Sequence, residues 1–426
     1  MNKQRIPKNP ISPYDYKRKI LPLRQQAELK NKWLKKRLET ILPKLMQREN
    51  IDMWIIIARE YNEDPVIMSL LPEPMMSARR RTILVLTKQE DNTIERLIIK
   101  RGGLEGFYTS TWNPDKQEQY EYLAQIVKER NPETIGINTS DTFAFGDGLT
   151  YTEYNQLKTA LGPELMKRTK SAENLCVGWL ETRLLEEIEA YHGLVEITHA
   201  LVAEAFSSRV ITPSVTTTDD VVWHMRQTMH NLGLQAWFQP SIGIQAPDIT
   251  PENRRKLIKQ GDVLHCDVGF YYLGLATDIQ QMAYVLNLGE NDVPDYLKDA
   301  LEEGNRLQDH HAEAMKTGHT GNQILLKALE QAKKDGLTPS IYTHPIGVHG
   351  HAAGPLIGLW DRQQGVPGRG DYPLYNDTCY AIELNIKKQL PQWNKEIRIA
   401  LEQDAVYTNN QLHFMAGRQR KYHLVG

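Results

Sequence analysis

The sequence predicts an α/β domain at residues 22–175, followed by an α+β domain at residues 176–426 built from two similar helix-plus-hairpin halves. Two observations support this division. Apolar runs alternate with amphipathic stretches in the first half of the chain. A helix-forming phrase occurs twice in the second half, and each copy precedes a strand-rich region with two acidic residues. Residues 1–21 are a polar lead-in.

Composition and charge exclude several classes of function. The chain has 426 residues, a net charge of −2 and 24% charged residues, which is an ordinary globular composition. No basic stripe indicates a nucleic-acid partner, and no run of 18 apolar residues indicates a membrane span. The polar N-terminus lacks the apolar core of a signal peptide, so we expect a cytoplasmic protein, unless a signal peptide was removed before this chain begins. Three scattered cysteines predict buried thiols rather than a disulfide framework: Cys176, Cys266 and Cys379.

The first domain is expected to contain helices that cover a mixed sheet. An amphipathic helix is predicted at residues 23–49, and the apolar run at 51–60 is typical of a buried strand. Two strands that form a hairpin pair, a helix, a short strand and a second helix follow at residues 79–88, 95–103, 118–130, 134–140 and 151–161. This domain has no glycine-rich phosphate loop and no cluster of histidine or cysteine, so we interpret it as a scaffold or lid.

The second domain begins with a helical stretch at residues 180–207. The phrase at 211–234 then places threonines and aspartates before a helix that ends at Gly233. A similar phrase, with a turn, a threonine, a helix and Gly-Leu, recurs at 315–337. The recurrence predicts an internal duplication.

The first strand-rich region, HCDVGFYYLGLATDIQQ at residues 265–281, is predicted to be a hairpin. A turn centred between residues 272 and 273 would place Asp267 opposite Asp278, on the same side of the sheet. Like charges that face each other across a ladder are destabilising, and carboxylates avoid burial unless they are paired or bind a cation. The hairpin therefore predicts a bound cation.

The second strand-rich region, YAIELNIKKQLPQWNKEIRIALEQDA at residues 380–405, repeats this arrangement. A turn centred between residues 392 and 393 places Glu383 opposite Glu402. Trp393 at the tip is expected to pack or to form a dimer contact.

The four carboxylates are expected to meet near the pseudo-twofold axis of the duplicated domain. Two metal ions about 3.5–4 Å apart, held by carboxylates, are a common arrangement for hydrolysis. Such sites also take a neutral imidazole. The segment between the hairpins, THPIGVHGHAAGPLIG at residues 343–358, offers His344, His349 and His351.

The order of these residues resembles that of the pita-bread metallopeptidases, which include methionine aminopeptidase, aminopeptidase P, prolidase and the metal-free creatinases. The matching residues are Asp267 in CDVG, Asp278 eleven residues later in ATDIQQ, His349 in VHGHAAG, Glu383 in AIELN and Glu402 in ALEQDAVYT. The resemblance covers residues 180–426 and implies the pita-bread fold. The first domain is similar to the extra domain of the aminopeptidase P, prolidase and creatinase branch.

The resemblance implies two divalent metal ions, Mn²⁺ first, with Co²⁺, Zn²⁺ and Fe²⁺ as alternatives. The five matching residues would be the metal ligands. Glu383 would also act as the general base toward the attacking water. His351 and His344 would serve as catalytic proton-transfer groups.

Three positions depart from the family pattern. The segment before the first hairpin contains no histidine, and Gln245 lies nearest the place where the family carries one. Leu356 stands seven residues after His349, where a second family histidine is usual. Ala400 stands where the proline-directed branch has an arginine, and Arg398 is displaced by two residues. These changes weaken the expected grip on the substrate rather than the ligand set.

Three functions are consistent with these residues. The first is an Xaa-Pro aminopeptidase or dipeptidase that acts on short proline-containing peptides. The second is a creatinase-like hydrolase of a non-peptide C–N bond. The third is a catalytically impaired, metal-binding homologue that acts as a binding module and keeps the metal for stability. The complete ligand set favours the first function, and the two-domain members of the family imply a homodimer.

Overall fold

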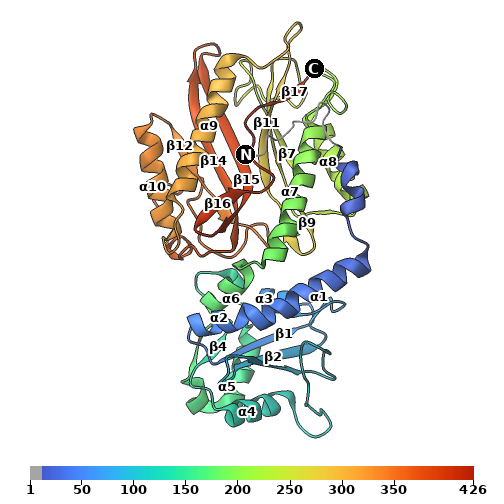
Figure 1. Cartoon of the computed structure of the whole chain (residues 1–426), viewed down its shortest axis with the longest axis vertical. Coiled ribbons are helices and arrows are strands. Elements are labelled where there is room, and N and C mark those ends of the chain that lie inside the picture. Colours follow the sequence, from blue (N-terminus) through green and yellow to red (C-terminus); the bar gives the residue numbers. More distant parts are fainter. Residues whose placement is uncertain (1–11) are drawn as a thin grey trace. The chain divides into compact units, whose positions relative to one another are not determined.

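The computed structural model describes residues 12–426, which form two compact units (Figure 1). The N-terminal unit is Pro22–Leu184. The C-terminal unit combines Leu185–Gly426 with the described residues up to Leu21. Of the expected lead-in, residues 1–11 lie outside the described part, and Pro13–Lys19 form a short 3-10 helix, η1. Among the described residues, no helix is both long and apolar enough to cross a membrane.

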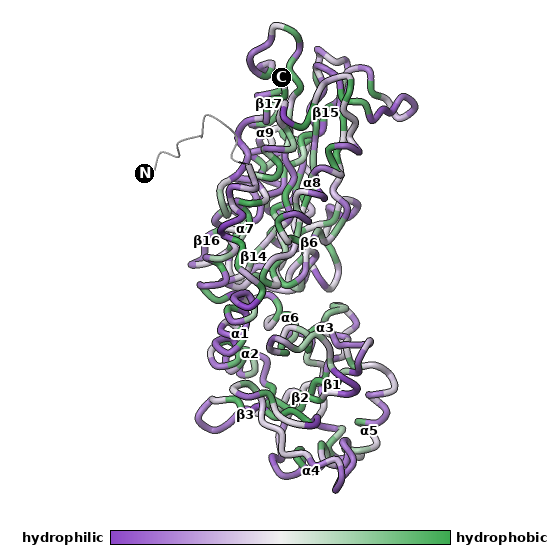
Figure 2. The backbone as a smooth tube through the Cα atoms, turned by 90° about the vertical axis from the view of Figure 1, so that its right-hand side faces the viewer, coloured by the Kyte–Doolittle hydropathy of each residue, from purple (hydrophilic) through white to green (hydrophobic). Residues whose placement is uncertain are grey.

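The N-terminal unit contains a mixed five-stranded sheet, as predicted. Its strand order is β3-β2-β1-β4-β5, with β1 pairing antiparallel to β2 and parallel to β4. The strands are β1 Met53–Arg59, β2 Arg81–Lys88, β3 Ile94–Ile99, β4 Ile135–Ile137 and β5 Thr169–Ser171. Figure 2 shows hydrophobic segments (green) where β1 and β2 cross this unit. Both strands are almost fully buried, which explains their continuous apolar sequence.

Helices accompany this sheet, which confirms the predicted α/β class. They are α1 Leu23–Thr40, α2 Leu42–Arg48, α3 Pro65–Leu70, α4 Gln119–Arg130, α5 Tyr151–Met166 and α6 Glu173–Glu181. The single helix expected at residues 23–49 is divided between α1 and α2. Pro43 stands in the first turn of α2, where its missing N–H is tolerated, whereas inside one long helix its ring would clash with the preceding turn.

The boundary between the units falls at Leu184, whereas the sequence division at residues 175–176 lies inside α6. Helix α6 is held to the N-terminal unit by Trp179. Its indole N–H donates to Ser69 Oγ of α3 at 2.8 Å, and the Arg37 guanidinium of α1 lies 4.5 Å from its ring centroid. These contacts are long-range in sequence, so the local pattern could not place the boundary.

The C-terminal unit contains the two predicted helix phrases. Thr217 caps α8 (Thr218–Leu232) and Thr320 caps α10 (Gly321–Lys334), each in a capping box. Helix α8 ends at Gly233, whose φ of 76° is left-handed. Each capped helix follows a longer one, α7 Leu185–Ala205 or α9 Asp295–Ala314. Helix α9 has no counterpart among the predicted elements.

A nine-stranded sheet in the described residues forms the centre of this unit, with the order β12-β14-β15-β11-β8-β7. Strand β13 pairs with β14, β16 with β15 and β17 with β11. These strands are β7 Ser241–Gln245, β8 Val263–Val268, β11 Ile279–Val285, β12 Pro339–Ile341, β13 His344–Pro345, β14 Thr378–Leu390, β15 Lys395–Thr408, β16 Gln411–Phe414 and β17 His423–Val425. A small second sheet contains β6 Gln235–Ala236, β9 Phe270–Tyr272 and β10 Leu275–Ala276.

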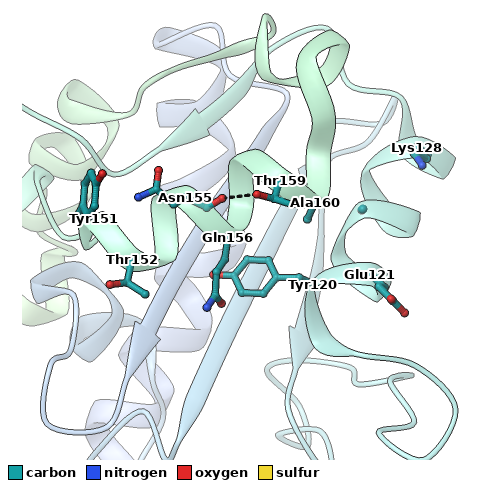
Figure 3. A pocket seen from close by; sticks show the side chains of 10 residues that line it. Tyr120, Glu121, Lys128, Tyr151, Thr152, Asn155, Gln156, Thr159 and Ala160 are labelled. Carbon is teal, nitrogen blue, oxygen red and sulfur yellow. Dashed lines mark hydrogen bonds between the residues drawn. The ribbon is translucent and has the colours of Figure 1, made fainter.

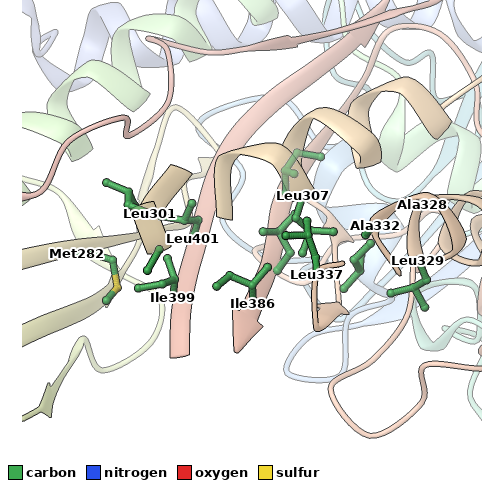
Figure 4. Packing of buried hydrophobic residues seen from close by; sticks show 14 of the residues in the cluster. Met282, Leu301, Leu307, Ala328, Leu329, Ala332, Leu337, Ile386, Ile399 and Leu401 are labelled. Atoms are coloured by element: carbon green, nitrogen blue, oxygen red, sulfur yellow. The ribbon is translucent and has the colours of Figure 1, made fainter. Parts of the chain in front are cut away.

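Helices α9 and α10 pack on this sheet through a buried apolar layer (Figure 4). Leu301 and Leu307 of α9 belong to the same cluster as Ile386, Ile399 and Leu401 of the long hairpin. Full burial of each such side chain contributes about 1.5–3 kcal/mol. The packing therefore holds β14 and β15 firmly, and these strands carry the acidic residues of the second hairpin.

The second hairpin has the predicted register, because Glu383 pairs with Glu402. The first does not: Asp267 pairs with Gln280 rather than with Asp278. The left-handed turn residues are Leu273 (φ 54°) and Gly274 (φ 74°), one position beyond the expected centre. This moves the pairing by two residues, so every side chain keeps its face. Asp267 and Asp278 thus become diagonal rather than direct neighbours.

Candidate metal centre

Six side chains of the C-terminal unit converge, and all six were singled out from the sequence. Three overlapping sets each bring ligand-type atoms within 4.8 Å of one another. These sets are Asp278 with His344 and His351, His344 with Glu383 and Glu402, and Asp267 with Asp278 and Glu402. Strands β8, β13, β14 and β15 carry four of the residues, so the sheet positions most of the cluster.

His344 lies at the middle of the cluster. Its Nε2 atom is 3.5 Å from Asp278 Oδ2 and 3.4 Å from Glu402 Oε1. The residue pairs with Ala381 across the β13–β14 ladder, which makes it a diagonal neighbour of Glu383 two positions further along β14. The exposed His351 lies against it, with the two ring centroids 4.6 Å apart.

Burial and mutual repulsion act strongly on the carboxylates. Burial, and then the charges of neighbouring carboxylates, raise the pKa of Asp278 and of Glu402 well above their usual range. Burial also raises the pKa of Asp267 to about 6 and that of Glu383 to about 7. Burial alone would lower the pKa of His344, but its contact with Glu402 and the charge of Glu383 raise it to about 9. The ionised form of the cluster therefore requires positive charge nearby.

The donor atoms in the cluster fit a divalent cation. Four buried ligand-type atoms have no hydrogen-bond partner in the structure: Asp267 Oδ1, Asp278 Oδ1, Glu402 Oε1 and His344 Nε2. Buried polar atoms are rarely left without a partner. Carboxylate oxygens with an imidazole nitrogen suit Mn²⁺, Fe²⁺, Co²⁺ or Zn²⁺.

Two further residues support the ligand carboxylates and were not identified from the sequence. The Gln280 amide donates to Glu383 and, at 2.9 Å, to Glu402. The buried Asp404 accepts the backbone N–H of Asp278 at 3.1 Å. Each follows a predicted ligand by two positions, Gln280 after Asp278 and Asp404 after Glu402, and this spacing places side chains on one face of an extended segment. That periodicity was the signal that could have revealed them.

His349 is absent from these convergent sets in the described residues, although the sequence predicted it as the nitrogen ligand. It is half-buried, and its carbonyl oxygen accepts the N–H of Gly347 at 3.0 Å. His344, which was expected to transfer protons, stands among the carboxylates instead. The pairing of β13 with β14 accounts for this difference, because that contact joins segments almost forty residues apart.

Gln245 and the displaced Arg398, from two of the places that depart from the family pattern, form a second, connected group. The Gln245 side chain bonds to the backbone of Arg398 at 2.8 and 2.9 Å. Arg398 Nη2 donates to the Tyr342 hydroxyl at 2.6 Å. Arg398, Ala400 and Glu402 share one face of β15, since they are two residues apart. The displaced arginine therefore faces the same side of the sheet as the cluster of carboxylates and histidines.

Two hollows away from the cluster are lined by described residues that form no such group. A groove of about 690 Å³ lies along α4 and α5 in the N-terminal unit, where Tyr120, Tyr151 and Gln156 line it (Figure 3). Its charged lining residues are Glu121 and Lys128. A hollow of about 820 Å³ in the C-terminal unit runs along β7 and includes Gln245.

Comparison with protein families gives a match to metallopeptidase family M24 at residues 189–409, which is more than half of the chain. This span contains all the convergent acids and histidines. Comparison of the sequence with curated proteins gives no match.

Solved structures with the same fold cover nearly the whole chain. The X-Pro aminopeptidase from Thermotoga maritima is 17% identical with a TM-score of 0.62, and the match covers 90% of this chain and 100% of that one. The Xaa-Pro dipeptidase from Bacillus anthracis is also 17% identical, with a TM-score of 0.61 and coverage of 90% and 98%. A variant of Escherichia coli aminopeptidase P is 12% identical, with a TM-score of 0.59 and coverage of 91% and 96%. The predicted pita-bread fold, preceded by an extra N-terminal domain, is confirmed.

Proposed function

The chain belongs to metallopeptidase family M24, and on this basis we propose that it is a dinuclear metal-dependent hydrolase that cleaves Xaa-Pro bonds in short peptides. The observation that carries the proposal is the group of buried ligand-type atoms without hydrogen-bond partners among Asp267, Asp278, Glu402 and His344. Similar structures named as an X-Pro aminopeptidase and an Xaa-Pro dipeptidase support the choice of bond.

The proposed ligands are four carboxylates and one imidazole. We assign this imidazole to His344 in place of His349, because His344 Nε2 lies within 3.5 Å of two of the carboxylates. The set favours two Mn²⁺ ions, with Co²⁺, Zn²⁺ or Fe²⁺ as alternatives. When bound, such ions would polarise the scissile carbonyl and lower the pKa of an attacking water.

The surrounding residues have separate roles in this proposal. Glu383 takes the proton of the attacking water as general base. Gln280 holds Glu383 and Glu402 in place through its amide. Partial burial and the charge of His344 lower the pKa of His351 to about 4, so this imidazole is neutral near pH 7. In contact with His344, it would pass the proton that Glu383 has taken on to the departing prolyl nitrogen.

A proline after the scissile bond suits a specialised site. Proline has no backbone N–H, so a peptidase that docks substrates through that group gains nothing from it. In the present chain Arg398 and Tyr342 offer donors on the side of the sheet that carries the cluster. They would contact the substrate in place of the family groups missing at Gln245 and Ala400.

Cleavage of a substrate panel tests the proposal. The full chain, supplied with Mn²⁺, Co²⁺ or Zn²⁺, is incubated with Xaa-Pro dipeptides, Xaa-Pro-Yaa tripeptides and small N-substituted amidines. Cleavage of dipeptides alone identifies a dipeptidase, and release of the first residue from tripeptides identifies an aminopeptidase. If every peptide remains intact at full metal occupancy, the peptidase proposal is wrong.

The same panel addresses the second candidate, a creatinase-like hydrolase. The changes at Gln245, Leu356 and Ala400 favour it, because they remove groups with which the family grips its peptide substrates. Cleavage of an amidine, together with intact peptides, would establish this function instead.

We also propose that the chain forms a homodimer. Light scattering should give a mass close to twice the 49.0 kDa of one chain. A mass of one chain across the micromolar range would contradict it.

A further inference from the structure

A cavity of about 1010 Å³ lies wholly within the N-terminal unit and is strongly cationic. Its lining contains six basic side chains and, among the described residues, neither aspartate nor glutamate. They are Arg59, Arg79, Arg80, Arg81, Lys100 and Arg101. So many like charges around one hollow are unfavourable unless counter-charges are close.

Two of the six have a structural partner. Glu153 is buried, with 1% of its side chain exposed, and it lies 3.0 Å from Arg59 Nε and 2.9 Å from Arg81 Nε. The Tyr120 hydroxyl donates to the same carboxylate. The single negative charge of Glu153 is thus shared by two guanidinium groups. It does not neutralise the other four basic side chains.

The charges of the other four basic side chains have little compensation from acidic groups. Arg79 is 77% exposed and lies 3.8 Å from Glu60, at the limit of an ion pair. Within the described chain, Arg80, Lys100 and Arg101 have no acidic side chain at ion-pair distance. Partial burial lowers the pKa of Lys100, and its ammonium donates only to a backbone carbonyl oxygen, that of Arg101, at 3.1 Å.

The backbone holds two of these arginines in an unusual conformation. Arg79 (φ 46°) and Arg80 (φ 57°) are consecutive non-glycine residues in the left-handed region. The carbonyl oxygen of Arg80 accepts the N–H of Glu60 at 2.8 Å, and the Arg80 N–H donates to the Glu60 carboxylate at 3.3 Å. Such strained conformations occur preferentially at ligand-binding sites.

We propose that this cavity binds a small phosphorylated molecule, independently of the metal centre. Guanidinium groups match phosphate oxygens with paired hydrogen bonds, and an ammonium adds a point charge. Arg80, Lys100 and Arg101 would hold the phosphate groups. Trp112 and Leu104 line the same cavity and offer an apolar wall to a flat or apolar portion of the ligand.

Calorimetric titration of the full chain with inorganic pyrophosphate tests the proposal. The protein is stripped of divalent ions and kept in a chelator, so that the metal centre cannot retain the anion. In 150 mM salt we expect one saturable site per chain with a micromolar Kd. Absence of saturable binding below millimolar pyrophosphate would overturn the proposal.

Variants that remove charge from the cavity test whether pyrophosphate binds there. The double variant Arg80→Asn with Lys100→Gln should weaken pyrophosphate binding at least tenfold, and asparagine tolerates the left-handed backbone at position 80. The matched control is Lys128→Gln with Lys158→Gln, which removes the same charge from the same unit outside the cavity. Equal weakening in both double variants would show that only net charge matters and would reject the site.

The affinity for ATP, compared with that for pyrophosphate, tests whether the apolar wall contributes to recognition. ATP should bind more tightly than pyrophosphate, and Trp112→Leu should remove that gain while leaving pyrophosphate affinity within twofold. If ATP has no advantage, the apolar wall plays no part in recognition and that element of the proposal is wrong.

Discussion

The two units of the chain differ sharply in their titratable groups. All 13 histidines lie in the C-terminal unit, and residues 22–184 contain none. The N-terminal unit instead gathers arginine and lysine, whose charges do not change near neutral pH. Histidine, the side chain whose ordinary pKa lies closest to pH 7, is thus confined to the unit that carries the cluster of carboxylates and histidines.

The buried carboxylates of the two units also differ in their hydrogen-bond partners. In the N-terminal unit the buried Asp64 accepts hydrogen bonds from Asn138 at 2.7 Å and from the backbone of α3, and Glu153 has its two arginines. In the C-terminal unit Asp278 and Glu402 are equally buried, yet each has an oxygen without a hydrogen-bond partner. A carboxylate that is satisfied by the protein indicates a structural role, whereas one left unsatisfied beside others indicates a bound cation.

Removal of metal should produce the largest difference between the two units. Dialysis against a chelator should abolish hydrolysis, because the carboxylate cluster alone cannot activate water. It should also destabilise the C-terminal unit, since a ligand that binds only the folded state stabilises it. Amide hydrogen exchange should therefore increase around β14 and β15 and stay unchanged in β1 and β2. Full activity in metal-free protein would rule out the metal centre.

Substitution Glu383→Gln should have the next largest effect. The amide keeps the shape of the side chain but cannot accept the proton of the attacking water, so kcat/KM should fall by about two to three orders of magnitude. Circular dichroism should be unchanged. The matched variant Glu396→Gln changes an exposed residue of the same hairpin and should retain activity. Turnover unaffected by Glu383→Gln would remove this residue from the mechanism.

The choice of nitrogen ligand can be decided by two alanine variants. His344→Ala should weaken metal binding by at least about tenfold, because it removes the imidazole that lies between Asp278 and Glu402. His349→Ala should leave metal stoichiometry intact. Elemental analysis after gel filtration measures both. Loss of metal from His349→Ala but not from His344→Ala would instead identify His349, the ligand predicted from the sequence.

Acidification should produce the smallest effect. It should change the stability of the two units in opposite directions. Burial lowers the pKa of His199, His311 and His423 to about 4. Below the usual value of 6.5 the unfolded state binds protons at these histidines that the folded state does not. With metal bound, when cations keep the cluster carboxylates ionised, the C-terminal unit should therefore lose stability as pH falls from 6.5 to 4.

In the N-terminal unit burial raises the pKa of Asp64 from 3.8 to about 6. Its folded state binds the extra proton, so stability there increases as pH falls from 6 to 4. Urea unfolding followed by hydrogen exchange at pH 7.0 and pH 4.5 reports the two units separately. Equal loss of stability in both units at pH 4.5 would contradict this assignment.

The sequence by itself determined the features that depend on local spacing. Glu383 and Glu402 pair as predicted because they are equidistant from a tight turn, and a hairpin transmits that symmetry directly. The caps at Thr217 and Thr320 also follow from residues within one helical turn. Five acids and histidines in family order indicated the fold, which the M24 match and the similar structures confirm.

Only the tertiary structure decided features that depend on contacts distant in the chain. The left-handed turn at Leu273 and Gly274 set the register that pairs Asp267 with Gln280. The β13–β14 ladder brought His344, rather than His349, among the carboxylates. The cationic cavity combines β1, the segment before β2 and the segment after β3. A sequence pattern reports which face of its own element a residue occupies, whereas the neighbour that it meets is chosen by packing of the whole unit.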